Sequence, residues 1–323
     1  MMQTIAPARA DRIAGCLFGA AIGDALGSAF EFVNAEVIER HAGSGIVTTY
    51  HPALPGSLLH PRKPGQPTDD TAMALSVAEA IASGEPLTAA LFAERFVRDL
   101  DRREGRYGAM FWSGGPGGAC TSALARLRAG AEPERCGVPE AGGNGAAMRA
   151  HPVGFLDERD RVLEVCALQA RVTHGHPGAV AAAQAVAVLV YDALHGKPLS
   201  ADVPAGIEEP TFTASWHDLH AHVEPSVVRL PARLRNVAMS GWETVSAAHA
   251  TILCFPNDPL SALGAAAGSG GDTDTLATIV GAILGARYGM AMFPEQLIEG
   301  LQARAAIQEI AELFSSTLPC RTA

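Results

Sequence analysis

Acidic residues lie beside three expected helix ends that are far apart in the sequence. Glu31 follows the first expected helix, Thr68–Thr71 opens another, and Asp272–Thr275 opens a glycine-rich helix near the end of the chain. One Thr or Asp at a helix start usually caps free backbone N–H groups. Capping needs only one oxygen per helix, however, and two of these starts supply two acids each. Because neighbouring carboxylates repel one another, the clusters favour a cation bound between them.

The ligand types indicate which cation these acids would hold. Asp, Glu and Thr offer only oxygen atoms, which suit Mg²⁺ or Mn²⁺, and no Cys or His lies within either Asp cluster, which argues against zinc. If the helices that carry Glu31 and Asp272–Thr275 pack antiparallel, their carboxylates meet at one end of the bundle. Thr68–Thr71 could point to the same place, and a pair of ions is then plausible.

Two glycine-rich segments suggest contacts to phosphate. Ser113–Gly118 runs straight into an expected helix, so its N–H groups and the helix dipole could hold an anion, and Gly142–Arg149 is a second such segment. Neither matches a P-loop or a dinucleotide-binding fingerprint, and ordinary turns explain both equally well. His174 and His176 could donate to a phosphate or cap the next helix. For Arg149 we expect an ion pair with a buried carboxylate rather than a phosphate contact.

Glycines recur every four residues in two of the expected helices. They are Gly15, Gly19, Gly23 and Gly27 in the first, and Gly281, Gly285 and Gly289 near the end of the chain. Since glycine destabilises a helix interior by about 1 kcal/mol relative to alanine, a repeated glycine face indicates two backbones that approach too closely for side chains. We predict that both helices lie in the core. Alternatively, the glycines only tolerate neighbours in a crowded interior.

Helical periodicity dominates the rest of the chain, and no segment shows the alternation of a strand. The expected helices are Arg12–Gly27, Thr71–Ser83, Thr88–Arg103, Ala119–Arg128, Val162–Arg171, Pro177–Leu194, Trp242–Phe255, Asp274–Tyr288 and Pro294–Leu313. Three stretches rich in Pro or Gly are expected to be loops, namely Tyr50–Pro67, Ala131–Gly145 and Lys197–Pro210. The segment Thr211–Ser240 is the least readable part of the chain.

Composition points to one globular, all-α domain. Of the 323 residues, 48% are hydrophobic, 18% charged and only 6% aromatic. This excludes a disordered or fibrous chain, and the shortage of aromatic residues favours packed helices over a β-sandwich or barrel. No stretch has the composition of a flexible linker, so we expect a single domain over residues 1–323. The formal net charge of −10 argues against a nucleic-acid-binding surface.

Several features indicate a cytoplasmic protein that does not cross a membrane. The cysteines are scattered without a close pair, so reduced thiols are the simplest explanation. Met1–Arg12 lacks the apolar segment of a signal peptide. The most hydrophobic run, Ala179–Tyr191, is shorter than the roughly 20 residues that span a bilayer. We expect this run to be a core helix.

Five motifs, in order along nearly the whole chain, resemble those of the ADP-ribosylglycohydrolase family. They are Gly15–Gly27 followed by Glu31 and Phe32, Lys63–Met73, Gly143–Arg149, Thr173–Pro177 and Gly270–Thr275. The family includes the hydrolase that reactivates ADP-ribosylated dinitrogenase reductase, and hydrolases that act on ADP-ribosylarginine and ADP-ribosylserine. The resemblance implies an orthogonally packed, all-helical fold with a binuclear Mg²⁺ or Mn²⁺ centre in a cleft.

The resemblance also implies roles for individual residues. The metal ligands would be Thr68, Asp69, Asp70, Asp272, Asp274 and Thr275. The catalytic residues would be Glu31, near the scissile bond, and Asp70. The ADP-ribose-binding residues would be Gly114, Gly115, Gly117 and Gly118 around the diphosphate, with Asn144, Gly145, Met148, His174 and Trp242 in the rest of the cleft, the last stacking on adenine.

The implied reaction cleaves the bond between C1″ of the distal ribose and an acceptor, and it releases ADP-ribose. Two ions would hold the 2″ and 3″ hydroxyls and activate a water, and Glu31 would take its proton or protonate the leaving group. We expect an ADP-ribosylated protein as substrate, with arginine favoured over serine. Two departures put the acceptor in doubt. Gly115 stands where relatives of the dinitrogenase-reductase type carry Asp, and Gly142 stands where the serine-specific type carries an aromatic residue.

Three other functions compete with this expectation. A protein with the same pocket could shield a target, as an immunity partner of an ADP-ribosylating toxin would, but a pure binder does not need every carboxylate. A structural, crystallin-like role is a rarer alternative. A Mg²⁺-dependent prenyl-chain enzyme needs an Asp-Asp-x-x-Asp cluster, which Asp69–Met73 does not supply.

Overall fold

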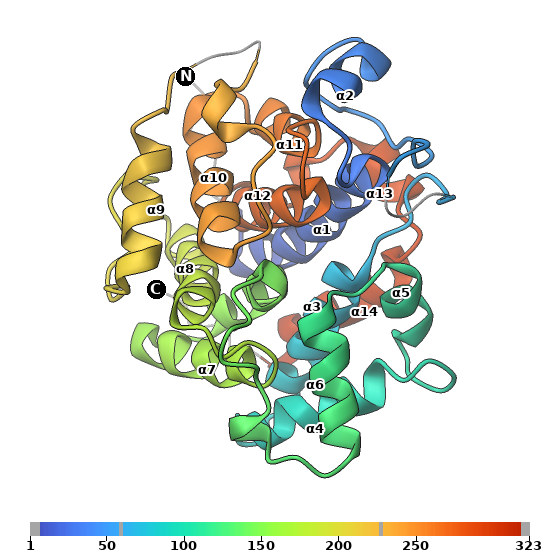
Figure 1. Ribbon diagram of the computed structural model, residues 1–323, viewed down its shortest axis with the longest axis vertical. Helices are drawn as coiled ribbons and strands as arrows, with labels where there is room; N and C mark the ends of the chain where they lie inside the picture. The colour runs from blue at the N-terminus through green and yellow to red at the C-terminus, as the bar shows by residue number, and fades with distance from the viewer. Residues whose placement is uncertain (1–6, 58–60, 226–228, 318–323) are drawn as a thin grey trace.

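The computed structural model describes residues 7–57, 61–225 and 229–317, and over these ranges it contains helices and isolated β-bridges but no β-strand. The protein is all-α, as predicted (Figure 1). The helices of the described ranges are α1 (Arg9–Gly27), α2 (Ala35–Ala42), α3 (Asp69–Ala82), α4 (Ala89–Asp99), α5 (Gly108–Ser113), α6 (Gly118–Arg128), α7 (Arg159–Arg171), α8 (Pro177–Leu194), α9 (Pro210–His220), α10 (Gly241–Cys254), α11 (Pro259–Ala267), α12 (Thr273–Tyr288), α13 (Glu295–Gly300) and α14 (Arg304–Thr317).

Helices α1 and α12 lie side by side in the middle of the molecule (Figure 1) and pack backbone against backbone, as the glycine stripes predict. A Cβ added at Gly19 would lie 2.2 Å from the carbonyl oxygen of Gly281. At the two ends of the contact, Gly15 meets Gly285 and Gly27 meets Thr273, so the helices run antiparallel. The C-terminus of α1 therefore lies beside the N-terminus of α12.

Other helices surround this central pair. Helices α8, α10 and α11 contact α12, while α14 contacts both α1 and α3. Figure 1 shows α3–α6 gathered on one side of α1 and α12, and α7–α10 on the other. Segments from both groups meet at the end of the pair where α1 finishes and α12 begins, and they line the cavity described below.

Periodicity does not predict four of the helices, namely α2, α5, α9 and α11. Helix α9 lies within the least readable stretch, Thr211–Ser240. It buries only Phe212, Trp216 and Leu219 among polar residues, so its apolar face is too narrow to stand out in the sequence. Its start is fixed locally, because Glu209 caps it by accepting the N–H of Phe212 at 2.7 Å.

Several predicted helix boundaries are wrong by three or four residues: α1 starts at Arg9, α7 starts at Arg159 and α14 ends at Thr317. The stretch Pro294–Leu313 is not one helix but two, α13 and α14, because Leu301 is extended with a ψ of 117°. The next N–H, of Gln302, donates to the carbonyl of Gly65 at 2.9 Å, a contact with a distant loop that no local pattern indicates. Helix α4 ends at Asp99 rather than at Arg103.

Two helical stretches have the length and hydropathy of a membrane span, Arg9–Phe30 and Pro177–Leu194. Within the fold, 94% and 72% of their most apolar windows are buried, as in the core helices of globular proteins. The described cysteines are all buried and free: Cys16, Cys120, Cys136, Cys166 and Cys254. Cys320 lies outside the described residues.

Candidate active site

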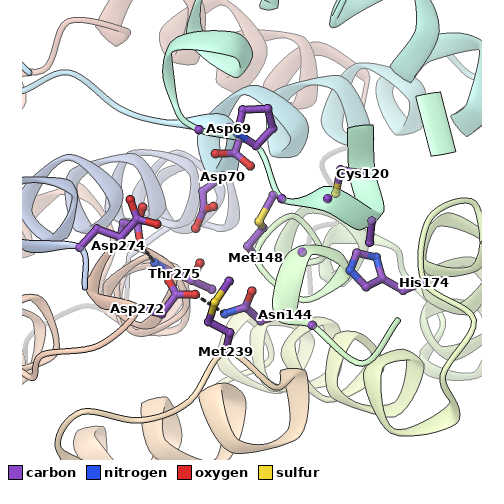
Figure 2. Close-up of a pocket in the computed structure, with 18 of the residues that line it drawn as sticks. Asp69, Asp70, Cys120, Asn144, Met148, His174, Met239, Asp272, Asp274 and Thr275 are labelled. Carbon is purple, nitrogen blue, oxygen red and sulfur yellow. Dashed lines mark hydrogen bonds between the residues drawn. The ribbon is translucent and has the colours of Figure 1, made fainter. Parts of the chain in front are cut away.

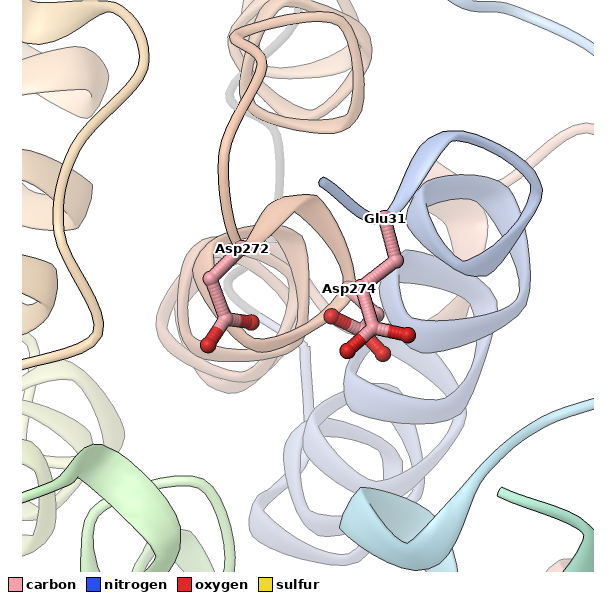
Figure 3. A group of neighbouring side chains, drawn as sticks. All are labelled: Glu31, Asp272 and Asp274. Carbon is pink, nitrogen blue, oxygen red and sulfur yellow. The ribbon is translucent and has the colours of Figure 1, made fainter. Parts of the chain in front are cut away.

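The packing of α1 against α12 brings Glu31, Asp272 and Asp274 together (Figure 3). Glu31 follows α1 after a single 3₁₀ turn, Ser28–Phe30, and the two aspartates lie at the start of α12. One carboxylate oxygen of each residue lies within 4.8 Å of those of the other two, and all three side chains are buried. The predicted meeting of these acids at one end of the bundle is confirmed.

The first turn of α3 adds two more acids. Asp69 and Asp70 line a cavity of about 350 Å³ together with the three acids above and Thr275. In Figure 2 the carboxylates of Asp69 and Asp70 face the acids of α12 across this cavity. Five carboxylates and a threonine hydroxyl from three distant segments therefore share one space.

Asp24, in the last turn of α1, fixes the position of the α3 start. Its buried carboxylate accepts the N–H of Thr68 at 2.8 Å, the N–H of Thr71 at 3.1 Å and the hydroxyl of Thr71 at 2.6 Å. Thr68 is fully buried, caps α3 by accepting the N–H of Asp70 at 3.2 Å, and is not among the described residues that line the cavity. Asp24 is absent from the predicted site, although an acid inside an apolar, glycine-striped helix is a signal that could reveal it.

Burial and the repulsion between neighbouring carboxylates raise the pKa values of four of these acids. Burial is the main cause for Glu31, whose pKa rises to about 9, and neighbouring aspartates add repulsion. The pKa values of Asp69, Asp70 and Asp274 also lie well above the usual range, first because of burial and then because of nearby acids. The positive charge of the nearby Arg62 lowers the pKa of Glu31 and Asp69, but it does not offset the effect of burial.

The donor set fits hard divalent cations. Two buried carboxylate oxygens, Glu31 Oε2 and Asp70 Oδ2, have no hydrogen-bond partner in the described part of the chain. Leaving such atoms unpaired is unfavourable, so each one needs an explanation. Oxygen-only ligands at this density are those that Mg²⁺ or Mn²⁺ prefer. Cations between the acids would pair both oxygens and offset the repulsion.

Arg62 lies close to the acids and is also absent from the predicted site. Its side chain is buried, and its guanidinium donates to the carbonyls of Gln66 and Ser113, at 2.9 Å each, and to that of Pro67. These bonds tie the loop before α3 to the end of α5. The positive charge also lowers the pKa of several of the acids, opposing the effect of burial.

The first glycine loop forms another part of the cavity wall. Gly115, Gly117 and Gly118 line the cavity, and α6 begins at Gly118 without a side-chain cap. Gly117 and Gly118 are exposed, and a Cβ at either would meet nothing within 4 Å, so this helix start has room for an anion. Gly114 differs, because a Cβ there would lie 2.3 Å from the backbone N of Asp69. It lets the loop pack on α3 and is not among the described lining residues.

The second glycine segment contributes Asn144, Gly145 and Met148 to the cavity wall. The side-chain amide of Asn144 donates to Asp272 Oδ2 at 2.9 Å and lies 3.2 Å from Thr244 Oγ1 (Figure 2). Asn144 therefore orients one of the clustered acids as well as lining the cavity. Met148 is buried and adds an apolar surface beside the polar groups.

His174 presents a hydrogen-bond donor to the cavity. Buried Arg149 donates to Thr173 Oγ1 at 2.7 Å, and that hydroxyl lies 2.7 Å from His174 Nδ1. The hydroxyl donates its hydrogen bond to Nδ1, because its other possible acceptor, Ala170 O, is 3.5 Å away. Since Nδ1 is then the acceptor, the ring proton of His174 is on Nε2. Burial, and then the charge of Arg149, lower the pKa of His174 to about 3. The neutral ring can thus donate through Nε2 to a ligand oxygen.

The predicted ion pair of Arg149 is wrong. Its guanidinium donates to Gln169 Oε1 at 2.8 Å, to the carbonyl of Gln169 at 3.0 Å and to that of Gly145 at 2.9 Å. It also lies 4.7 Å from the centre of the Phe96 ring. Neutral oxygens satisfy this buried cation, so Arg149 supports the second glycine segment and, through Thr173, His174.

Trp242 is not among the described residues that line the cavity. Its ring lies 4.9 Å from that of His176, and a Cβ at Gly142 would lie 2.8 Å from the indole. His176 caps α8, since its Nδ1 accepts the N–H of Gly178 at 3.1 Å. The indole thus packs behind the second glycine segment, and it occupies the space that a side chain at Gly142 would need.

Comparison with known proteins shows which family the chain belongs to. A sequence model described as ADP-ribosylglycohydrolase matches residues 6–321. The chain belongs to the ADP-ribosylglycohydrolase family. ADP-ribosylglycohydrolases are glycosyl hydrolases, and the protein is an enzyme of this class.

Individual relatives extend over nearly the whole chain. The protein is 29% identical to the ADP-ribosyl-[dinitrogen reductase] glycohydrolase of Rhodospirillum rubrum, over 92% of each chain. It is 28% identical to the ADP-ribosylarginine hydrolase of Serratia proteamaculans, over 94% of this chain and 78% of that protein. A solved structure named ADP-ribosylglycohydrolase-related protein complex superposes with a TM-score of 0.74 at 25% identity, over 96% of this chain and 98% of the other. The two proteins thus share the ADP-ribosylglycohydrolase fold over nearly the whole chain.

Proposed function

We propose that the protein hydrolyses the bond between C1″ of ADP-ribose and an arginine side chain of a modified protein. The observation that carries this proposal is that five carboxylates and the uncapped, glycine-rich start of a helix line one cavity. These two surfaces suit the two parts of the substrate, the ribose to be cleaved and the diphosphate. Arginine is favoured because one relative is named for hydrolysing ADP-ribosylarginine.

Two Mg²⁺ or Mn²⁺ ions are the proposed cofactors. The residues that would hold them are Thr68, Asp69, Asp70, Asp272, Asp274 and Thr275. The unpaired buried oxygens of the cluster and the raised pKa values of its acids support this assignment. When bound, such ions supply positive charge that lowers the pKa of water and orients ribose hydroxyls.

Glu31 is proposed to move protons at the scissile bond. It lies beside Asp272 and Asp274, and its Oε2 is buried and unpaired. In the proposed step, Glu31 takes a proton from the attacking water while a C1″–O bond forms and the C1″–N bond breaks. The proton then passes to the departing guanidine nitrogen. Asp70 Oδ2, the other unpaired oxygen, would orient the water against C1″.

The rest of the cavity would hold the ADP-ribose. The N–H groups at Gly117 and Gly118 suit the diphosphate, because a helix start favours an anion. His174 Nε2 would donate to a phosphate or ribose oxygen. Gly145 and Met148 would lie against the ribose, and Asn144 would keep Asp272 in place. Binding of the product ADP-ribose should therefore be measurable without an acceptor.

The protein is also proposed to act in the cytoplasm on ADP-ribosylated proteins rather than on nucleic acid. The described cysteines are free and buried, which suits a reducing compartment. The net charge of −10 disfavours a polyanionic partner.

Release of ADP-ribose from defined peptides tests the proposal. Arginine-linked and serine-linked ADP-ribosyl peptides are incubated with the protein, with Mg²⁺ or with EDTA. We expect release from the arginine-linked peptide that EDTA abolishes. Asp272→Asn should lose this release, whereas Asp258→Asn, at an exposed cap of α11, should retain it. Tight binding of ADP-ribose without any release would favour the shielding role, and release that EDTA leaves unchanged would contradict the metal assignment.

A further inference from the structure

Backbone strain is concentrated at one edge of the cavity. Among the described residues, Phe32 (φ 58°) and Asn236 (φ 54°) are the non-glycine residues with a left-handed backbone. Asparagine tolerates this conformation, but for a bulky residue such as Phe it is a costly outlier. Such outliers persist where the surrounding structure enforces them, and they cluster at functional sites. Phe32 directly follows Glu31, so its conformation needs a functional explanation.

Both residues are held by the loop that leads into Asp272. The N–H of Phe32 donates to the carbonyl of Gly271 at 2.7 Å, and the N–H of Asn236 donates to that of Ser269 at 2.9 Å. Val237 forms an isolated parallel bridge with Gly271. The segments that contain Phe32 and Val237 therefore both attach to the loop that carries Asp272.

This arrangement leaves two large apolar side chains exposed at the cavity. Phe32 is 40% exposed and Met239 is 48% exposed, and both line the cavity that holds the acids. Figure 2 shows Met239 next to Asp272 and Asn144. Exposed large hydrophobic residues are few in the described chain, so two of them at one site point to a ligand.

We propose that Phe32 and Met239 contact the acceptor side chain and so determine which leaving group is accepted. This inference rests on the proposed function. The leaving group must lie beside Glu31, because that residue would exchange its proton, and Phe32 is the next residue. The diphosphate would lie elsewhere, at Gly117 and Gly118, and Phe32 and Met239 are therefore not needed to hold it.

The chemistry of the pair suits an arginine side chain. A planar guanidinium stacks on an aromatic ring, and a flexible thioether packs against methylene groups. No lysine or arginine is among the described residues that line the cavity, so the lining side chains themselves bring no positive charge against a cationic leaving group. A serine acceptor offers neither a planar group nor methylenes beyond Cβ. Removing the ring should therefore affect the arginine-linked substrate more.

Two variants and a matched control test the proposal. Phe32→Leu removes the ring but keeps an apolar side chain, and Met239→Ala removes the thioether. Val37→Ala is the control, because Val37 is 39% exposed on α2 and is not among the described lining residues. Each protein is assayed for kcat/KM on arginine-linked and serine-linked ADP-ribosyl peptides, and its Kd for ADP-ribose is measured by calorimetry.

We expect Phe32→Leu to lower kcat/KM for the arginine-linked peptide about 10-fold, and Met239→Ala about 3-fold. The Kd for ADP-ribose should change less than 2-fold in both, and Val37→Ala should match the wild type throughout. A loss of ADP-ribose affinity as large as the loss of kcat/KM would overturn the proposal, since the two residues would then bind ADP-ribose. Unchanged kcat/KM in both variants would also overturn it. A wild-type protein that releases ADP-ribose from neither peptide would instead refute the proposed function.

Discussion

The contact between α1 and α12 differs sharply from the cavity at its end, although the same two helices form both. Along the contact, Gly19 and Gly281 bring the backbones so close that no side chain fits. At the end, buried acids crowd together, two of their oxygens are unpaired, and Phe32 has a left-handed backbone. Tight packing in one region can hold an unfavourable arrangement in the other, which is common at functional sites. Substitutions should therefore affect stability in opposite directions in the two regions.

The largest loss of stability is expected from a methyl group in the helix contact. A Cβ at Gly285 would lie 1.9 Å from the carbonyl oxygen of Gly15, and neither backbone can move without opening the core. Gly285→Ala should lower the free energy of unfolding by about 3 kcal/mol, measured by urea denaturation. Gly45→Ala is the control, since a Cβ there meets nothing within 4 Å. Similar stabilities for the two variants would mean that the contact is not tightly packed.

The scaffold also contains buried histidines that should make it sensitive to acid. Burial lowers the pKa of His220 to about 4 and that of His249 to about 3, and the two rings are joined by a 2.8 Å hydrogen bond. Other titratable groups around the pair are His217, Asp192, Lys197 and Asp202. Below the unfolded-state pKa of about 6.5 the unfolded chain binds more protons than the folded one, so stability falls as the pH drops from about 6.5 towards 4.

This acid sensitivity can be assigned to one residue. Each such histidine should lower the free energy of unfolding by about 1.4 kcal/mol for each pH unit that the pH drops in that range. His249→Phe should therefore reduce the slope of unfolding free energy against pH between 6 and 4, whereas His222→Gln, at an exposed position, should not. An unchanged slope in His249→Phe would show that the buried pair is not the source.

In the cavity, removing a charge should stabilise the protein when no metal is present. Burial and the acids around it raise the pKa of Asp274 well above its usual range, so its carboxylate form is unfavourable there. In EDTA, Asp274→Asn should raise the free energy of unfolding by about 1 kcal/mol. In Mn²⁺ the order should reverse, because the wild type gains stability from the bound ion. A variant that is less stable than the wild type under both conditions would contradict this account.

An effect as small as that of Asp274→Asn is expected at Phe32, where glycine should be better tolerated than alanine. Since φ is 58°, Phe32→Gly should be about 1 kcal/mol more stable than Phe32→Ala. Both variants remove the ring, so the comparison isolates the backbone. Thermal unfolding in EDTA measures the difference. If the alanine variant were the more stable, Phe32 would carry no strain.

Regular spacing made the scaffold predictable, whereas individual polar contacts were not. The four-residue glycine period predicts the close approach of α1 and α12, and this contact alone places Glu31 beside Asp272 and Asp274. By contrast, nothing local to α1 shows that Asp24 accepts hydrogen bonds from the start of α3, because its partners lie more than forty residues away in the sequence.

The roles of two side chains depend on neighbours that residue type does not reveal. Arginine suggests an ion pair, yet Arg149 is satisfied by Gln169 and backbone carbonyls. The stacking of Trp242 on adenine, which the family resemblance implies, stays a prediction; in the structure the indole packs against His176 and is not among the described residues that line the cavity. In both cases the three-dimensional neighbours, which lie far away in the sequence, decide the role.

The central claim is that the five carboxylates bind divalent cations, and Mn²⁺ titration of the protein tests it most directly. Mn²⁺ binding is followed by calorimetry and electron paramagnetic resonance in the wild type, in Asp272→Asn and in the remote variant Asp258→Asn. We predict saturable binding of two Mn²⁺ per wild-type chain, the same in Asp258→Asn, and at least a 10-fold weaker affinity in Asp272→Asn. Equal binding in all three proteins, or no saturable binding in the wild type, would contradict the account.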